Sequence, residues 1–318
     1  HHRMVEVDMM GNTIHNWDML ERGYTMHHAI SQDKQGNILA TVSKTSAKIA
    51  NGKDVRINDF IIRMDPEKGE ILQEWDLVHM LDSARYGMTD YNLTADPYAQ
   101  NASNWAHNNG IVEWGNDYLA TARYQGIFKF NKAGGIEWII SPHGYWRDRY
   151  LKLLLNPLHA DRTPITDPDV IAGTKNCDDF EWPWGCHTAV PLPNGHIFYF
   201  NNGYGRNFKL DFTDRKNVYT CGIEYEVDEV NRTVRQVWQY GKERGTAYFT
   251  PARSGVQYLE QTGNRLICPG MSNVLSNGNR GARVTEVDPE TQEIVFELEL
   301  EDAIYQRVYR MSLYPDNQ

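Results

Sequence analysis

The chain has 318 residues, of which 41% are hydrophobic and 12% aromatic, so it can bury a large core. Its formal net charge of −10 and pI near 5.6 argue against a nucleic-acid or anionic-membrane partner. No apolar run approaches the length of a transmembrane helix, and no charged-then-apolar leader opens the chain, so we expect no signal peptide within it. The 9 Trp and 18 Tyr are more than a core alone tends to use, and such rings suit a cleft for a flat aromatic ligand.

A repeated pair of β-hairpins is the main signal along the chain. One hairpin consists of two apolar strands joined by a turn rich in Asp, Pro, Asn and Gly. It occurs five times, at residues 5–17, 60–77, 127–140, 223–240 and 284–300. A second hairpin, whose first strand is short, precedes the last four copies, at residues 27–42, 107–122, 187–200 and 254–268.

The two hairpins together make a four-stranded meander, and a recurring meander indicates a β-propeller. We count five readable blades, the first shared between the N-terminal strands (about 3–17) and the C-terminal strands (about 307–315). Residues 1–318 are expected to form one domain. Helical periodicity is confined to residues 77–85 and 146–155, and the long insertions 82–105 and 142–185 are expected to be ordered lids over the channel mouth.

Cys177 and Cys186 lie in one irregular loop, and no metal-finger spacing is present. A local disulfide, which would suit an oxidising compartment, and two unpaired thiols remain open alternatives. We interpret Asp178 and Asp179 in the same loop as solvated charges.

Histidines recur at the start of the short first strands, as His27-His28, His107 and His187. In a propeller these starts surround one end of the central channel, so we expect the imidazoles to converge there. The alternative is that core or turn histidines were repeated as the blades duplicated. The hairpin after His187 also returns the chain toward its starting edge, which brings Arg206 to the same rim.

Converging imidazoles suit either a metal ion or group transfer, with histidine as nucleophile or proton donor. Arg206 favours the second interpretation. A guanidinium repels a divalent cation, whereas it stabilises the oxygens of a transferring sulfuryl or phosphoryl group. We therefore expect group transfer without a metal.

Four longer motifs make the chain resemble the bacterial arylsulfate sulfotransferases that use no adenylylated sulfate donor: NWAHNNG (104–110), CHTAVPLPNG (186–195), NNGYGR (201–206) and VWQYGKERG (237–245). The resemblance covers nearly the whole chain. It implies a six-bladed β-propeller of four-stranded antiparallel blades, in the periplasm or otherwise exported. It also implies ping-pong transfer of a sulfuryl group from an aryl sulfate to a phenol through a sulfohistidine, without cofactor or metal.

The resemblance also assigns roles to single residues. His107 is expected to bind and orient the sulfuryl group, His187 to act as acid or base at the phenolic oxygen, and Arg206 to neutralise the sulfuryl oxygens. The position of the family's nucleophilic histidine falls on Asn273, whose amide is a very poor nucleophile. Three interpretations stay open: an inactivated site, a different route that uses His107, His187 or direct transfer, and a propeller kept only for binding.

Six further residues are candidates for substrate binding, because they face the expected channel or offer a wall for an aryl ring: His28, Tyr98, Arg123, Tyr124, Trp184 and Tyr204. For Trp184, packing in the core is the alternative. The expected partners are an aryl sulfate donor and a phenolic acceptor, and a homodimer contact is left open. The chief rival is a catalytically silent propeller that binds sulfated aromatics. A metal-dependent propeller hydrolase would need carboxylates and asparagines converging on an ion, and the inner strands carry no such aligned set.

Overall fold

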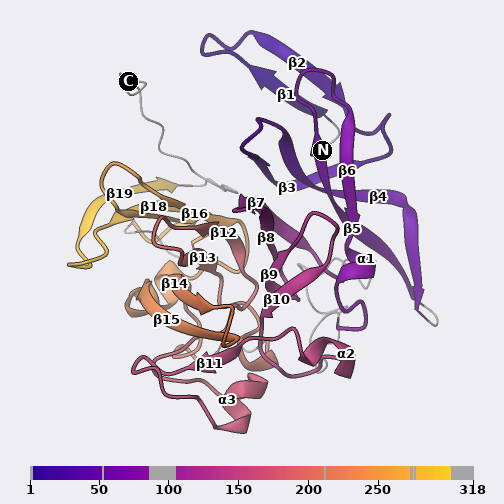
Figure 1. Ribbon diagram of the computed structural model, residues 1–318. Helices are drawn as coiled ribbons and strands as arrows, with labels where there is room; N and C mark the ends of the chain where they lie inside the picture. Colours follow the sequence, from indigo (N-terminus) through magenta and orange to yellow (C-terminus); the bar gives the residue numbers. More distant parts are fainter. Residues whose placement is uncertain are drawn as a thin grey trace.

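The computed structural model describes residues 3–51, 54–85, 105–210, 213–272, 275 and 277–301. These residues form an all-β, propeller-like arrangement of four antiparallel blades (Figure 1). The first blade consists of β3 (Thr25–Gln32), β4 (Ile38–Asn51), β5 (Asp54–Met64) and β6 (Ile71–Asp76). The second consists of β7 (Asn108–Trp114), β8 (Asp117–Ala122), β9 (Gly126–Phe130) and β10 (Ile136–Ile140). The third consists of β12 (His187–Pro191), β13 (Ile197–Asn201), β14 (Cys221–Asp228) and β15 (Thr233–Tyr240), and the fourth of β16 (Ser254–Tyr258), β17 (Arg265–Pro269), β18 (Gly281–Val287) and β19 (Ile294–Glu301).

The predicted double hairpins are confirmed in all four blades, because each blade pairs its strands in sequence order. The number of blades differs from the prediction: the described part of the chain contains four blades and not six. Four stretches carry both hairpins, and the fifth copy forms only a two-stranded sheet of β1 (Arg3–Val7) and β2 (Thr13–Asp18). The strands expected to complete that blade, residues 307–315, lie outside the described residues.

The insertion between the second and third blades adds structure of its own. β11 (Asn156–Leu158) pairs in parallel with β15 and becomes a fifth, outermost strand of the third blade. The predicted helical stretches contain α1 (Leu77–Met80) and α2 (Asp148–Leu151). A further helix, α3 (Pro168–Ala172), was not predicted; the side chain of Asp167 caps its first turn, with Pro168 beside it.

Short turns complete the described secondary structure: α4 (Gly245–Tyr248) and two 3₁₀ turns, η2 (Arg206–Phe208) and η3 (Lys242–Arg244). None of the helices in the described segments is long and apolar enough to cross a membrane.

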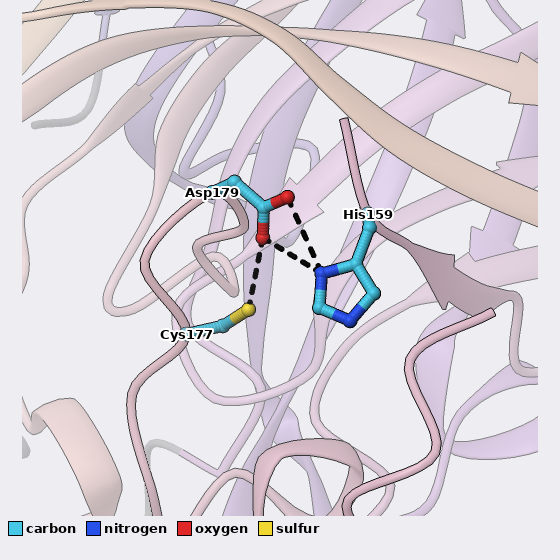
Figure 2. Close-up of side chains that lie close together, drawn as sticks. All are labelled: His159, Cys177 and Asp179. Atoms are coloured by element: carbon cyan, nitrogen blue, oxygen red, sulfur yellow. Dashed lines mark hydrogen bonds and ion pairs between the residues drawn. The ribbon is translucent and has the colours of Figure 1, made fainter. Parts of the chain in front are cut away.

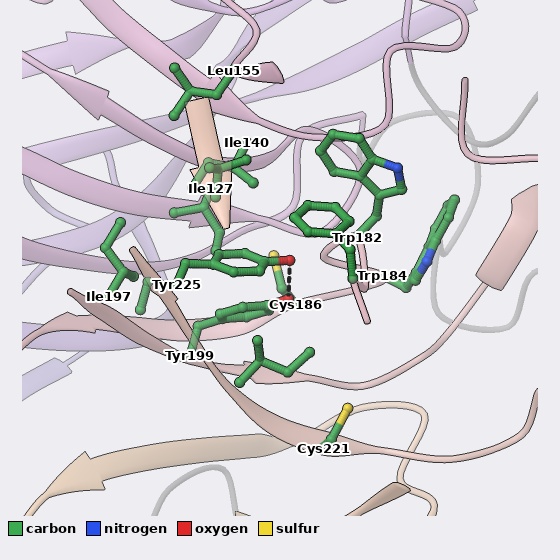
Figure 3. Close-up of a cluster of buried hydrophobic side chains, with 14 of the residues drawn as sticks. Ile127, Ile140, Leu155, Trp182, Trp184, Cys186, Ile197, Tyr199, Cys221 and Tyr225 are labelled. Atoms are coloured by element: carbon green, nitrogen blue, oxygen red, sulfur yellow. Dashed lines mark hydrogen bonds between the residues drawn. The ribbon is translucent and has the colours of Figure 1, made fainter. Parts of the chain in front are cut away.

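The short first strand of each blade is the innermost, and β3, β7, β12 and β16 succeed one another as neighbours. A large core cluster fills the space between the second and third blades (Figure 3). In it, the hydroxyl of Tyr199 donates to that of Tyr225 over 2.7 Å, and the hydroxyl of Tyr225 donates in turn to the carbonyl oxygen of Glu181. The indole of Trp182 donates to the carbonyl oxygen of Val170 in α3 over 2.8 Å. The 142–185 insertion is thus packed into this core at Trp182.

Gly126, at the start of β9, is a position where the backbone itself requires glycine. Its φ is +94°, and an added Cβ would overlap the carbonyl oxygen of Ile140 on the neighbouring strand. Gly195 has a similar φ of +85° but open space around the added atom. We expect Gly195→Ala to lower the free energy of unfolding by about 1–2 kcal/mol through backbone strain alone. Gly126→Ala should cost roughly 1–3 kcal/mol more because of overpacking. Urea titration of both variants checks this, and equal losses would contradict it.

Candidate active site

The structure brings His28, His107 and His187 together at the starts of three inner strands. Each start is bulged: the register of β3 and β12 shifts at the histidine, and that of β7 shifts directly after it. His28 and His107 themselves have left-handed backbones, with φ of 54° and 51°. Their Nε2 atoms lie 3.0 Å apart, and the rings of His28 and His187 have centroids 5.9 Å apart.

His28 is bonded on both sides of its ring. Its Nδ1 lies 3.0 Å from Nδ1 of His27, opposite the contact with His107. The Nε2 atom of His27 lies 3.5 Å from Oδ1 of the buried Asp59. The three imidazoles and the carboxylate therefore form a chain, in which the ring nitrogens point at one another rather than converging on a single ion.

Asp59 sets the direction of this chain. Its Oδ1 accepts from the hydroxyl of Ser43 over 2.9 Å, and its Oδ2 accepts from the backbone N–H of Asn108 over 3.1 Å. Burial alone would raise the pKa of this carboxyl, but the contacts with His27 and Asn108 bring the pKa below its usual value. Asp59 is therefore an ionised acceptor.

If each ring carries one N–H and one lone pair, the acceptor at one end orders the whole chain. Nε2–H of His27 faces Asp59, and its Nδ1 accepts from Nδ1–H of His28. Nε2 of His28 then accepts from Nε2–H of His107. The Nδ1 atom of His107 consequently carries a lone pair.

The tautomer of His187 is fixed by a separate contact. Its Nδ1 lies 2.7 Å from Oδ1 of Asn202 and 3.2 Å from the carbonyl oxygen of Gly185. The Asn202 amide donates its Nδ2–H to the carbonyl oxygen of Thr250 over 2.9 Å, so its oxygen must face His187. Both partners of Nδ1 are acceptors, and the lone pair of His187 is therefore on Nε2.

His28, His107 and His187 are neutral. Burial, and then the charges of neighbouring groups, hold the pKa values of His28 and His107 well below the ordinary value. Burial and the charge of Arg123 lower the pKa of His187 to about 4. Neutral imidazoles retain their lone pairs at neutral pH, as a base or a nucleophile requires.

Arg123 supplies the positive charge that reaches these rings. Its guanidinium is buried, donates to the carbonyl oxygen of Pro251 over 3.0 Å, and lies 4.3 Å from the centroid of the Tyr204 ring. Its backbone N–H donates to the carbonyl oxygen of His107 over 3.0 Å, which anchors the start of β7. Tyr124 follows it, with its ring centroid 6.5 Å from that of His107.

Arg206 is held by partners of its own. Its guanidinium forms a buried ion pair with Glu181, donates to the carbonyl oxygen of Asn217 over 3.1 Å, and lies 3.8 Å from the centroid of the Tyr219 ring. The hairpin predicted after His187 is present, yet the arginine fork at its end is occupied by a carboxylate.

The remaining sequence candidates divide into two groups. Trp184 lies in the core cluster of Figure 3 with 2% of its surface exposed, which fits the core alternative. Tyr98 and Asn273 lie outside the described residues. The sequence reasoning missed Asp59 and Asn202. Both are polar residues close to an apolar run of a strand, residues 60–62 for Asp59 and residues 197–200 for Asn202.

The disulfide between Cys177 and Cys186 does not form, so that alternative is wrong for this structure. The thiol of Cys177 donates to the carboxylate of Asp179 over 3.1 Å. Cys186 is instead fully buried in the apolar cluster, where burial raises the pKa of its thiol to about 12.

Sequence comparison relates this chain to known proteins. A family model described as arylsulfotransferase (ASST) matches residues 1–310. Two curated proteins named arylsulfate sulfotransferase AssT, from Escherichia coli O6:H1 and Lelliottia amnigena, are each 28% identical to the chain. Each alignment covers 98% of this chain and 57% of the relative, so the chain spans little more than half the length of these relatives. A solved europium-containing methanol dehydrogenase aligns with a TM-score of 0.42 and 12% identity over 88% of this chain and 47% of that one, which is too distant to carry an argument.

The direction of the histidine chain is testable at Asp59. In Asp59→Asn the amide oxygen must face the N–H of Asn108, which leaves an NH₂ group toward His27. We expect the tautomers of His27, His28 and His107 to reverse, because a donor has replaced the acceptor. ¹⁵N NMR of labelled histidines reads the protonated nitrogen of each ring. Asp33→Asn, which removes a carboxylate paired with Arg63 in the same blade, is the control and should leave the tautomers unchanged.

The depressed histidine pKa values predict a loss of stability in acid. An unfolded histidine takes up a proton near pH 6.5, whereas folded His187 does so only near pH 4. The free energy of unfolding should therefore fall between about pH 6.5 and 4, by about 3 kcal/mol for this residue. Chemical denaturation across this range should show a smaller fall in His187→Gln. His79→Gln, at a side chain 82% exposed, is the control, and an undiminished fall in His187→Gln contradicts the assignment.

Proposed function

Because the chain belongs to the arylsulfotransferase family, we propose that it transfers a sulfuryl group from an aryl sulfate ester to a phenolic acceptor. The observation that carries the proposal is the set of neutral imidazoles at the starts of adjacent inner strands, beside the buried guanidinium of Arg123. Such a site combines lone pairs that accept a proton or attack sulfur with a permanent cation for the sulfuryl oxygens.

His187 is proposed as the base and acid at the phenolic oxygens. Its Nε2 lone pair takes the proton of the acceptor hydroxyl as that oxygen attacks sulfur. The bond between sulfur and the donor's aryl oxygen breaks, and the same proton is available to the departing phenolate. Asn202 keeps Nε2 in this state by accepting from Nδ1–H, and it stabilises the imidazolium that forms.

A ping-pong route additionally requires a nucleophilic nitrogen. With asparagine at position 273, the imidazole nitrogens that carry lone pairs, Nδ1 of His107 and Nε2 of His187, are the candidates. His107 has the stronger claim, because the chain from Asp59 through His27 and His28 can share the positive charge that its ring acquires on sulfurylation.

Two guanidiniums are candidates for holding the sulfuryl oxygens. Arg123 already acts on the pKa values of His28, His107 and His187 through its charge. Arg206, which the sequence resemblance names, would have to exchange the carboxylate of Glu181 for the sulfuryl group. We propose Arg123 as the direct contact and Arg206 as a support of the β13–β14 connection.

Further parts of the proposal follow the family. The protein would act in the periplasm, as a single propeller domain, on small-molecule donors and acceptors. Asn273 is the one feature that favours the alternative of a silent propeller for sulfated aromatics, since it removes the side chain expected to be sulfurylated.

The release of 4-nitrophenolate from 4-nitrophenyl sulfate, with phenol as acceptor, tests the transfer. We expect turnover by the unaltered chain and a loss in kcat of about 10²–10⁴-fold in His187→Ala, as for the removal of a general acid–base group. Arg123→Gln should lower kcat/KM further than Arg206→Gln. Arg162→Gln, at a side chain 64% exposed, is the control and should change neither parameter.

The outcome also separates the alternatives. Intact-mass analysis that finds a sulfuryl adduct lost in His107→Ala supports the covalent route, and turnover without an adduct supports direct transfer. If the unaltered chain and Asn273→His both bind the donor without turnover, the chain is a binding propeller and the proposal fails.

A further inference from the structure

We propose that His159, Cys177 and Asp179 form a binding site for one zinc-like divalent transition-metal ion, at the outer edge of the third blade. The three side chains turn toward one another (Figure 2), and one ligand atom of each lies within 4.8 Å of the others. This inference concerns a different part of the molecule from the histidine chain, so it stands independently of the proposed function.

The distances suit a tetrahedral metal. Nδ1 of His159 lies 3.0 Å from Oδ1 of Asp179, and Sγ of Cys177 lies 3.1 Å from the same oxygen. Nitrogen and oxygen ligands at about 2.0–2.1 Å from a tetrahedral zinc ion lie about 3.3–3.4 Å from each other. His159 and Asp179 therefore need to separate by only a few tenths of an ångström to admit the ion.

The chemistry of the three ligands restricts the choice of metal. A thiolate and an imidazole are borderline-soft donors that select zinc and similar ions, whereas calcium and magnesium prefer sites made wholly of oxygen. The side chains of His159 and Asp179 are 40% and 36% exposed. A metal can therefore enter from solvent, and water can supply the fourth ligand.

The backbone holds the ligands in place before a metal arrives. β11 ends at Leu158 on its partner β15, and His159 opens a tight turn in which its N–H donates to Thr163 and its carbonyl oxygen accepts from Arg162, both over 2.9 Å. Oδ2 of Asp179 accepts from the N–H of Ala160 over 2.9 Å. That bond joins the two loops and leaves Oδ1 facing the other two ligands.

Coordination changes one protonation state. The carboxyl of Asp179 is ionised, because its hydrogen bonds lower its pKa to about 2 against the effect of burial. The thiol of Cys177 donates its proton in a hydrogen bond to Asp179, so it is protonated in the metal-free protein. Binding then forms a metal–sulfur bond and releases the thiol proton to solvent, which makes the affinity rise with pH.

Zinc and cobalt(II) titrations of the full chain, first stripped with a chelator, test the site. We expect the unaltered chain to bind one ion that is lost when the trio is mutated. Cobalt should give a thiolate-to-cobalt charge-transfer band, and zinc binding should release a proton. Cys177→Ser should abolish the band and the proton release. Cys177→Ser and His159→Gln should each weaken binding by more than the roughly 10–100-fold that loss of an outer-shell partner causes. His196→Gln is the matched control: it removes an imidazole 2.6 Å from the carboxylate of Glu224 and should leave the affinity unchanged.

A measurement on the unaltered chain keeps the test independent of folding defects in the variants. Cys177 is partly exposed, whereas the side chains of Cys186, Cys221 and Cys268 are at most 1% exposed. Zinc should therefore protect the chain from alkylation, with Cys177 as the protected residue in peptide mapping. Alkylation of Cys177 at an unchanged rate, or cobalt binding without a thiolate band, would show that the trio is hydrogen-bonded only and would overturn the proposal.

Discussion

The left-handed backbone at the start of the inner strands is the constraint on which the site depends. His28 and His107 have φ of 54° and 51°, and Thr188 and Arg253 have 41° and 61° at the starts of the next two inner strands. A side chain costs about 1–2 kcal/mol in this region, and such strain persists only where the surroundings impose it. Here the bulge turns successive residues out of the strand alternation. It is the reason that histidines from separate blades reach hydrogen-bonding distance.

Hydrogen bonds to acceptors of fixed orientation stabilise the closely spaced imidazoles. Imidazoles this close would repel one another if protonated, and burial already disfavours their charged forms. Asp59 at one end and Asn202 at the other each present an acceptor whose orientation is fixed by a backbone group. These acceptors let buried, neutral His28, His107 and His187 each keep one tautomer. The same low dielectric strengthens the effect of Arg123, whose charge opposes protonation of the rings.

Much of this architecture was predictable because it repeats. The turn residues and apolar alternation of each hairpin appear four times over, and the shared register of the histidines predicted that they would converge. The rest depended on contacts without a repeated pattern. Nothing in the sequence links Glu181 to Arg206, and the pairing of β11 with β15 rests on three residues from an irregular insertion. The tautomers could not be read either, because they follow from the direction of hydrogen bonds. The blade count differs within the described residues, where the fifth copy forms a hairpin alone.

The segment from Asp179 to His187 joins the surface of the molecule to its centre. It is irregular backbone, so side-chain contacts rather than a strand ladder must hold it. The carboxylate of Glu181 binds Arg206 and the hydroxyl of Tyr219, and Trp182 is anchored to α3. The rigidity of His187 at the end of this segment is therefore set in part outside the inner strands. Only the seven residues of this segment separate Asp179, at the outer edge of the third blade, from His187.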